Sequence, residues 1–197
     1  NVLAVGLGGG SVPKYIHHHL PQVATHVIEI NPQVIRIARS HFALPDDDER
    51  FSVIEGDGVD YLLAHPNSAQ VLMIDAFDSF GIPDAMCTQA FFDSCAEALT
   101  LEGMFAINLW GSDKNFDIYL QRIEQSFNQR VLILPTGRPG NVVVFGFKRT
   151  PVDLRITSLR ERAKRLEQDH KIEFLEFVEK LRDHNQSSGH RLLLETE

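Results

Sequence analysis

Cysteine is scarce in this chain of 197 residues. Its two cysteines, Cys87 and Cys95, have the spacing of neither a metal-binding motif nor a disulfide framework. We therefore expect a cytoplasmic protein in a reducing compartment. Cys95 falls on a predicted helix and is expected in the core, whereas Cys87 falls in a predicted loop, where a free thiol is possible.

Long apolar runs are also missing. No stretch approaches the roughly 18–20 apolar residues that span a bilayer, and no signal peptide is visible. We therefore expect no membrane as a partner. The chain begins with Asn1 directly before its first predicted strand, which leaves open whether an N-terminal segment is missing.

Basic residues are outnumbered, with 19 Lys and Arg against 27 Asp and Glu and a net charge of −8. An acidic protein does not attract phosphate backbones, so we expect no nucleic-acid partner and favour a small cationic substrate. Three histidines stand together at 17–19, but consecutive helical side chains point about 100° apart and cannot converge on one ion. We predict no metal site.

What the chain does have is a glycine-rich turn directly after its first apolar run. Residues 2–5 are apolar, and glycines follow at positions 6, 8, 9 and 10. A strand, such a turn and a helix let the backbone approach a nucleotide, because glycine has no Cβ. Glu29 ends the next predicted strand, 23 residues after Gly6, where a carboxylate can accept hydrogen bonds from both ribose hydroxyls. Gly6, Gly8, Gly10 and Glu29 are therefore candidates for binding a nucleoside; without Glu29, the glycines would suit any tight turn.

Strands and helices alternate through residue 147. We predict strands near 2–6, 25–30, 51–55, 70–75, 103–109, 130–135 and 141–147, and helices near 12–19, 32–40, 58–64, 88–99 and 114–127. This alternation predicts an α/β fold with a mostly parallel sheet. Only residues 136–140 join the last two strands, which is too short for a parallel crossover, so that pair must be antiparallel. A Rossmann-like, seven-stranded sheet ending in a hairpin is the layout of the class I methyltransferase fold; nicotinamide-binding domains normally lack that hairpin.

Pro151 marks a predicted boundary between a nucleoside-binding catalytic domain, residues 1–150, and a helical C-terminal extension, residues 151–197. Apolar residues in the extension step by three and four along 156–166 and 174–181, which predicts two amphipathic helices. We interpret them as a cover on the domain or a homodimer contact rather than a ligand site. Residues 184–190 are expected to be a flexible end.

Acidic residues follow two further predicted strands, and ligands in such sheets bind at the carboxyl ends of the strands. Asp57, which precedes Gly58, can accept a hydrogen bond from an adenine amino group, cap the following helix, or do both. No Lys or Arg stands at these strand ends, which favours a positively charged nucleoside over a phosphate.

Asp75 and Asp78 follow the fourth strand, which we expect to be fully buried. Beside Phe77 and Phe80, they would form a partly apolar acidic pocket. Burying two carboxylates without a cation is costly, so if both point inward a cation belongs between them. The alternative is a pair of solvated loop acids.

Four motifs, in this order and spacing, resemble the spermidine synthase family of polyamine aminopropyltransferases: Gly6 to Ser11, Glu29-Ile30-Asn31, Gly56-Asp57-Gly58 and Asp75-Ala76-Phe77-Asp78. The resemblance covers residues 2–147. It implies aminopropyl transfer from decarboxylated S-adenosylmethionine to a polyamine such as putrescine, with Glu29 at the ribose and Asp57 at the adenine. It also implies that Asp75 acts at the reacting amine, that Asp78 is a second catalytic acid, and that the loop 76–87 closes over the substrates.

The chain departs from this family at Gly9, where the family usually has Asp, and at Asn31, which replaces another Asp. The family's N-terminal β-hairpin domain, which supplies part of the polyamine site, is not in this sequence. An acid at position 9 would repel the carboxylate of ordinary S-adenosylmethionine by about 4 kcal/mol at ~4 Å, and Gly9 removes that repulsion. A methyltransferase that uses S-adenosylmethionine is therefore one alternative, and a non-catalytic nucleoside-binding domain is another.

Overall fold

The structure is a computed structural model that describes residues 1–78, 81–136 and 140–194. Among these residues, seven strands form one sheet in the order β3-β2-β1-β4-β5-β7-β6. The strands are β1 Val2–Val5, β2 Thr25–Glu29, β3 Phe51–Glu55, β4 Ala69–Ile74, β5 Leu99–Trp110, β6 Val131–Pro135 and β7 Asn141–Phe147. The helices are α1 Ser11–His19, α2 Pro32–His41, α3 Gly58–Ala64, η1 Asp84–Cys87, α4 Gln89–Ala98, α5 Phe116–Ser126, α6 Ile156–His170 and α7 Phe174–His184. The predicted fold class is confirmed.

The chain divides into two compact units, Asn1–Ile107 and Asn108–Glu197. We call them unit 1 and unit 2 and describe each by itself. The domain boundary expected after residue 150 stays a prediction. In the described residues, no helix combines the length and the apolar character that crossing a membrane requires.

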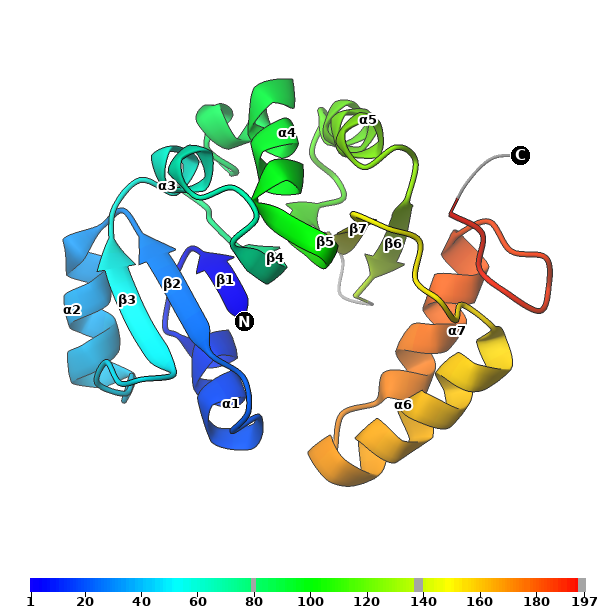
Figure 1. Cartoon of the computed structure of the whole chain (residues 1–197), viewed down its shortest axis with the longest axis horizontal. Helices are drawn as coiled ribbons and strands as arrows, with labels where there is room; N and C mark the ends of the chain where they lie inside the picture. The colour runs from blue at the N-terminus through cyan, green and yellow to red at the C-terminus, as the bar shows by residue number, and fades with distance from the viewer. Residues whose placement is uncertain (79–80, 137–139, 195–197) are drawn as a thin grey trace. The chain divides into compact units, whose positions relative to one another are not determined.

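In unit 1, β1 lies between β2 and β4, and all three strands run parallel (Figure 1). Val5, the last residue of β1, pairs with Ile28 on one side and with Ile74 on the other. The three strands therefore end at the same edge of the sheet. This register places the glycine turn between the segments that follow β2 and β4.

Side-chain caps fix where two helices of unit 1 begin. The Asn31 side chain accepts a hydrogen bond from the Gln33 N–H at 2.9 Å, and Pro32 supplies a preset φ at the first helical position of α2. Thr88 caps α4 in the same way by accepting from the Phe91 N–H at 3.1 Å. The chain therefore turns sharply from β2 into α2, directly after Glu29.

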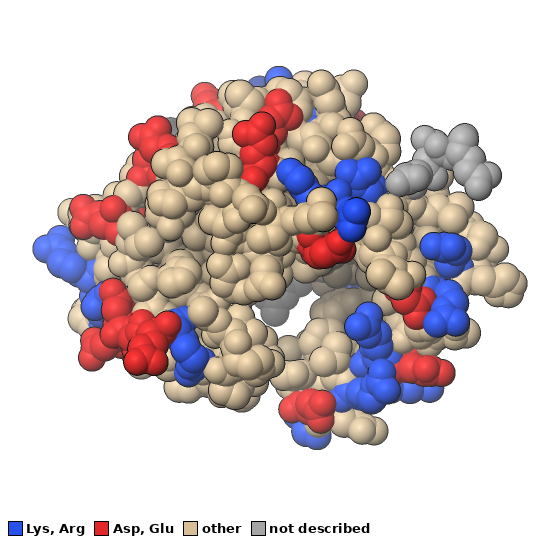
Figure 2. Space-filling view, in the orientation of Figure 1, with Lys and Arg blue, Asp and Glu red and all other residues tan. Residues whose placement is uncertain are grey.

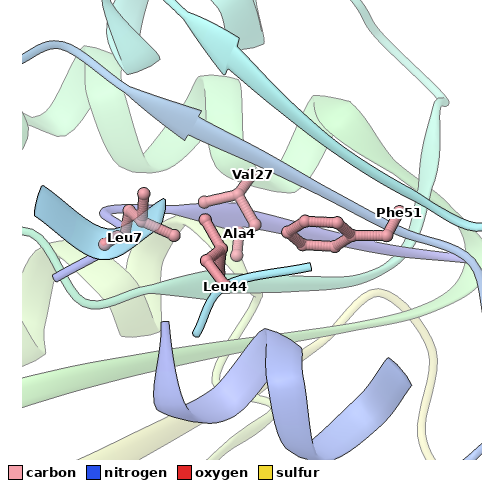
Figure 3. Packing of buried hydrophobic residues seen from close by; sticks show 6 residues of the cluster. Ala4, Leu7, Val27, Leu44 and Phe51 are labelled. Atoms are coloured by element: carbon pink, nitrogen blue, oxygen red, sulfur yellow. The ribbon is translucent and has the colours of Figure 1, made fainter. Parts of the chain in front are cut away.

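A hydrophobic cluster under the glycine turn anchors it to the sheet (Figure 3). Ala4, Val27 and Phe51 come from β1, β2 and β3, while Leu7 and Leu44 come from the segments after β1 and α2. All five are buried, and burying a large side chain of this kind contributes about 1.5–3 kcal/mol. This packing therefore holds the glycine turn against the sheet.

In unit 2, β6 and β7 pair antiparallel, with Leu132 opposite Phe145, as the short connection requires. The expectation of a flexible end at residues 184–190 is wrong at Asn185, whose side chain binds both the N–H and the C=O of Ile133, at 2.7 and 2.8 Å. Beyond it, Leu192 and Leu194 are buried in a second core cluster. These leucines anchor the end of the chain, and our sequence analysis overlooked them.

Candidate functional site

One cavity of about 540 Å³ lies in unit 1 at the carboxyl ends of β1, β2 and β4. It brings together seven of the eight site residues predicted from the sequence: Gly6, Gly8, Glu29, Asp57, Gly58, Asp75 and Asp78. The eighth, Gly10, does not line it. The two strand-end features found in the sequence, glycines and carboxylates, thus meet around a common space.

Glycine is needed at positions 6 and 8 of the turn for different structural reasons. Gly6 has φ +96°, and an added Cβ would overlap the carbonyl oxygen of Asp75. Gly8 also has a positive φ, +52°, but an added Cβ there would meet nothing within 4 Å. Gly6 is therefore required where β1 passes the chain leaving β4, whereas Gly8 leaves open space where a ligand can approach the backbone.

Gly10 and Gly58 are constrained by packing. Gly10, which has φ +70°, is the residue before α1, and an added Cβ would overlap the side chain of Leu44. Gly58 is buried, and an added Cβ would overlap the side chain of Val5. Gly58 still lines the cavity, but nothing in the structure brings Gly10 to it.

Glu29 is the most constrained acid of the site, only 8% exposed. Its Oε2 accepts a hydrogen bond from the Leu7 N–H, and its Oε1 accepts one from the Asn31 N–H, both at 2.9 Å. A carboxylate has about four lone-pair positions, so each oxygen can still accept a second donor from the cavity. One buried group thus joins the glycine turn to the start of α2, a structural role that our sequence analysis did not foresee.

Asp57 caps α3, which is one of the roles that the sequence left open. Its Oδ1 accepts a hydrogen bond from the Val59 N–H at 2.7 Å. The side chain is exposed and lines the cavity. Its second oxygen makes no hydrogen bond within the part of the chain that the structure describes, so capping and ligand binding are compatible.

Asp75 and Asp78 line the same cavity, but neither side chain is buried in it. Both are exposed, and β4 is not fully buried, because Gln70 is exposed and Val71 and Met73 are half-buried. Asp78 closes a short turn, because its Oδ1 accepts from the Gly81 N–H at 3.1 Å. Phe77 lines the cavity, whereas Phe80 lies outside the described residues. These acids are therefore open to solvent as well as to a ligand.

Several apolar lining residues were not singled out from the sequence: Ile30, Val34, Pro83, Ala85 and Met86. The sequence signal that could have found one of them is the apolar Ile30 directly after Glu29. In the structure, Ile30 is 65% exposed. Met86 and Cys87 lie in the short helix η1 and not in a loop, and both are buried. Cys87 forms no disulfide within the described residues. Cys95 is buried in the core, as predicted.

The cavity is negatively charged. Its four ionisable lining residues are all acidic within the described chain, and no Lys, Arg or His joins them. Unit 1 as a whole has 4 Lys and Arg against 14 Asp and Glu, a net charge of −10, whereas unit 2 has 15 against 13, a net charge of +2. The acidic excess of the chain therefore belongs to the unit that holds the cavity, where it attracts cations.

Across the described residues, no group of three or more His, Cys, Asp or Glu is placed to hold a metal ion.

Residues 1–154 match the model of the spermine/spermidine synthase domain. The chain belongs to this family. A polyamine aminopropyltransferase of Chromobacterium violaceum is 38% identical over 194 residues, covering 98% of this chain and 74% of that protein. The family resemblance predicted from four short motifs is thus confirmed.

Methyltransferases are similar to this family member as well. The eEF1A lysine and N-terminal methyltransferase of Bos taurus is 31% identical over 152 residues, covering 65% of this chain and 22% of that protein. The solved structure of human methyltransferase-like protein 13 in complex with SAH has a TM-score of 0.78 at 28% identity, covering 87% of this chain and 82% of that one. The class I methyltransferase layout predicted from the sequence is confirmed by this likeness.

The different reasons for the glycines can be tested by stability measurements. We expect Gly6→Ala to lower the free energy of unfolding by about 2–4 kcal/mol, because it combines a strained φ with backbone overlap. Gly56→Ala is the matched control: it has no positive φ and no neighbour within 4 Å, so we expect a change of less than about 1 kcal/mol. Urea denaturation followed by circular dichroism measures both, and equal effects would contradict the role assigned to Gly6.

Proposed function

We propose that this protein transfers an aminopropyl group from decarboxylated S-adenosylmethionine to a polyamine such as putrescine. The observation that carries the proposal is the single cavity in which Glu29, Asp57, Asp75 and Asp78 meet without a lining cation. Both proposed substrates are cations, and the polyamine aminopropyltransferases among the relatives support this reaction.

The nucleoside binds at the part of the cavity that Glu29, Asp57 and Gly8 line. The remaining lone pairs of Glu29 accept the two ribose hydroxyls, and its bonds to the Leu7 and Asn31 N–H groups hold the carboxylate in place beforehand. Asp57 accepts from the adenine amino group. The apolar lining suits the faces of the adenine ring, and Gly8 leaves room beside the backbone.

Catalysis is assigned to Asp75 as general base. An alkylamine with a pKa near 10.4 must lose a proton before it attacks, and neutralising it at pH 7 costs about 4–5 kcal/mol. Asp75 takes that proton while the amine nitrogen forms a bond to the aminopropyl carbon beside the sulfonium. The carbon–sulfur bond breaks, its electron pair returns to sulfur, and neutral methylthioadenosine leaves.

Asp78 holds a second ammonium group of the polyamine. Its turn contact with the Gly81 N–H fixes the carboxylate at the exposed side of the cavity. A diamine bound between Asp78 and Asp75 would have one nitrogen anchored as a cation and the other free to react. The acceptor is therefore expected to carry at least two amines.

Methyl transfer from S-adenosylmethionine is the second candidate, and Gly9 favours it. Gly9 does not itself line the cavity but follows Gly8, which does, and it has no side chain that could repel a carboxylated nucleoside; methyltransferases are also among the relatives. An added Cβ at Gly9 would lie 3.1 Å from the ring of Phe42, which is 50% exposed and so has room to move. The position can therefore accept an acid by mutation.

Glu29 can be tested by binding alone. An amide at this position cannot accept from both backbone N–H groups while also serving two hydroxyls, so we expect Glu29→Gln to weaken nucleoside binding at least tenfold in calorimetry. Glu55→Gln removes the same charge from an exposed residue outside the cavity and should change the affinity by less than twofold. Equal affinities for both variants would remove Glu29 from the ribose site.

Asp75 can be tested by turnover. We expect Asp75→Asn to lower kcat with putrescine at least 100-fold, because a general base contributes about 10²–10⁴, while nucleoside affinity stays within about threefold. Asp84→Asn, an exposed acid of the same loop that does not line the cavity, should keep wild-type turnover. Near wild-type activity of Asp75→Asn would refute the base assignment.

If the wild type binds the nucleoside but catalyses neither aminopropyl nor methyl transfer, the non-catalytic alternative is favoured.

Gly9 can be tested by nucleoside preference. For the wild type, we expect decarboxylated S-adenosylmethionine to bind more tightly than S-adenosylmethionine. In Gly9→Asp, that preference should grow at least tenfold, because like charges ~4 Å apart repel by up to about 4 kcal/mol. Gly9→Asn has a similar size without the charge and should leave the preference unchanged. A wild type that prefers S-adenosylmethionine in calorimetry would reverse the order of the two candidate functions.

A further inference from the structure

Unit 2 has a cavity of its own, of about 670 Å³, between the helices α6 and α7 and the strands β6 and β7. Ile156, Leu159 and Leu181 pack in the second core cluster at one end of the helix pair. The cavity starts at Leu159 and Leu181 and continues toward the turn that connects the helices, where Leu166, Phe174 and Phe177 line it. The helix pair is thus packed on the strands at one end and leaves a hollow toward the other.

The walls of this cavity are apolar. Ala163 and Val178 are buried within it, and Leu134 and Phe145 contribute from the strands. Leu166 is 40% exposed at its edge. Sites for small molecules typically have volumes of about 300–1,000 Å³, apolar walls and a few polar groups that orient the ligand. This cavity meets the first two conditions.

The orienting groups are two arginines. Arg162 and Arg165 line the cavity, together with one acid, Asp169. Within the described residues, neither guanidinium has an ion pair or a hydrogen bond, although Arg160 on the same helix pairs with Glu179 at 2.6 Å. Figure 2 shows Lys and Arg side chains gathered, among some acids, on the surface formed by α6 and α7. Two free guanidiniums against one carboxylate leave a positive charge at the cavity, and guanidinium is well suited to carboxylate and related anions.

We propose that this cavity binds a small amphiphilic anion, which places an aromatic or aliphatic body among the apolar side chains and a single carboxylate or sulfonate head at Arg162 and Arg165. The charge of the rim decides the class of ligand, since an apolar cation would meet two like charges there. The site lies within unit 2 and is independent of the transfer reaction proposed above.

A pair of matched fluorescent probes tests the charge without any mutation. 8-Anilinonaphthalene-1-sulfonate has an apolar aromatic body and an anionic head, and N-phenyl-1-naphthylamine has the same body without the head. We expect saturable binding of one sulfonate probe per chain, at least about fivefold tighter than the neutral probe, as two partly exposed charge contacts allow. Decanoate should displace the sulfonate probe. Absence of saturable binding, or equal affinity for both probes, would overturn the proposal.

Variants without the arginine charges test where the anionic head group binds. We expect the double variant Arg162→Gln/Arg165→Gln to bind the sulfonate probe about fivefold more weakly and the neutral probe unchanged. Lys164→Gln is the control, because Lys164 is exposed on the same helix between the two arginines and does not line the cavity; it should keep wild-type affinity. Equal losses in both variants would overturn the assigned head-group site.

A second copy of the chain is the competing occupant. Sedimentation velocity of the wild type and of Leu166→Glu distinguishes it, since Leu166 stands at the exposed edge of the cavity. If the wild type is a dimer that this substitution dissociates, and the sulfonate probe is excluded from that dimer, the cavity is a subunit interface and the ligand proposal fails. We expect sulfonate-probe binding to the wild type in whichever oligomeric state it adopts.

Discussion

The geometry of the main site depends on one buried carboxylate, that of Glu29. Its two oxygens accept the N–H groups of Leu7 and Asn31, so it joins the turn after β1 to the helix that follows β2. Burying a charge is costly unless it is hydrogen-bonded, and two backbone donors offset that cost here. Because Glu29 also lines the cavity, the group that fixes the shape of the site is the one we propose as the ribose ligand.

Much of this was accessible from the sequence, because it rests on local patterns. Apolar runs followed by turns predicted the strands, and five connecting residues dictated the antiparallel hairpin. Of the eight site residues predicted from strand ends, seven line the cavity. Long-range packing was not accessible. Gly10 has the appearance of a ligand-contacting glycine, yet it is constrained by Leu44, 34 positions further along the chain. The exposure of Asp75 and Asp78 also depends on how β4 is covered by its neighbours, which no local pattern encodes.

The net charge of −8 conceals an uneven distribution. Unit 1 carries the entire acidic excess, and unit 2 is slightly basic. The chain average led us to expect a cationic substrate, which suits the acidic lining of the cavity at β1, β2 and β4, but it obscured the arginine-lined cavity of α6 and α7. Electrostatic attraction acts over about a Debye length, ~8–10 Å at physiological salt, so the local charge and not the chain average selects the ligand.

The two candidate reactions use the same chemistry and differ in which carbon of the sulfonium lies in line with the acceptor nitrogen. A sulfonium sulfur has three bonded carbons, and the one attacked is the one that lies in line with the acceptor nitrogen. The same cavity and the same proposed base would therefore serve aminopropyl or methyl transfer, depending on where the acceptor is anchored and which nucleoside tail is admitted. Under the proposed function, Asp78 would set the first variable. Position 9 would set the second, as the neighbour of the cavity-lining Gly8 in the glycine turn. A change of reaction would then need new residues only at these two places, while Glu29 and the rest of the turn stay as they are.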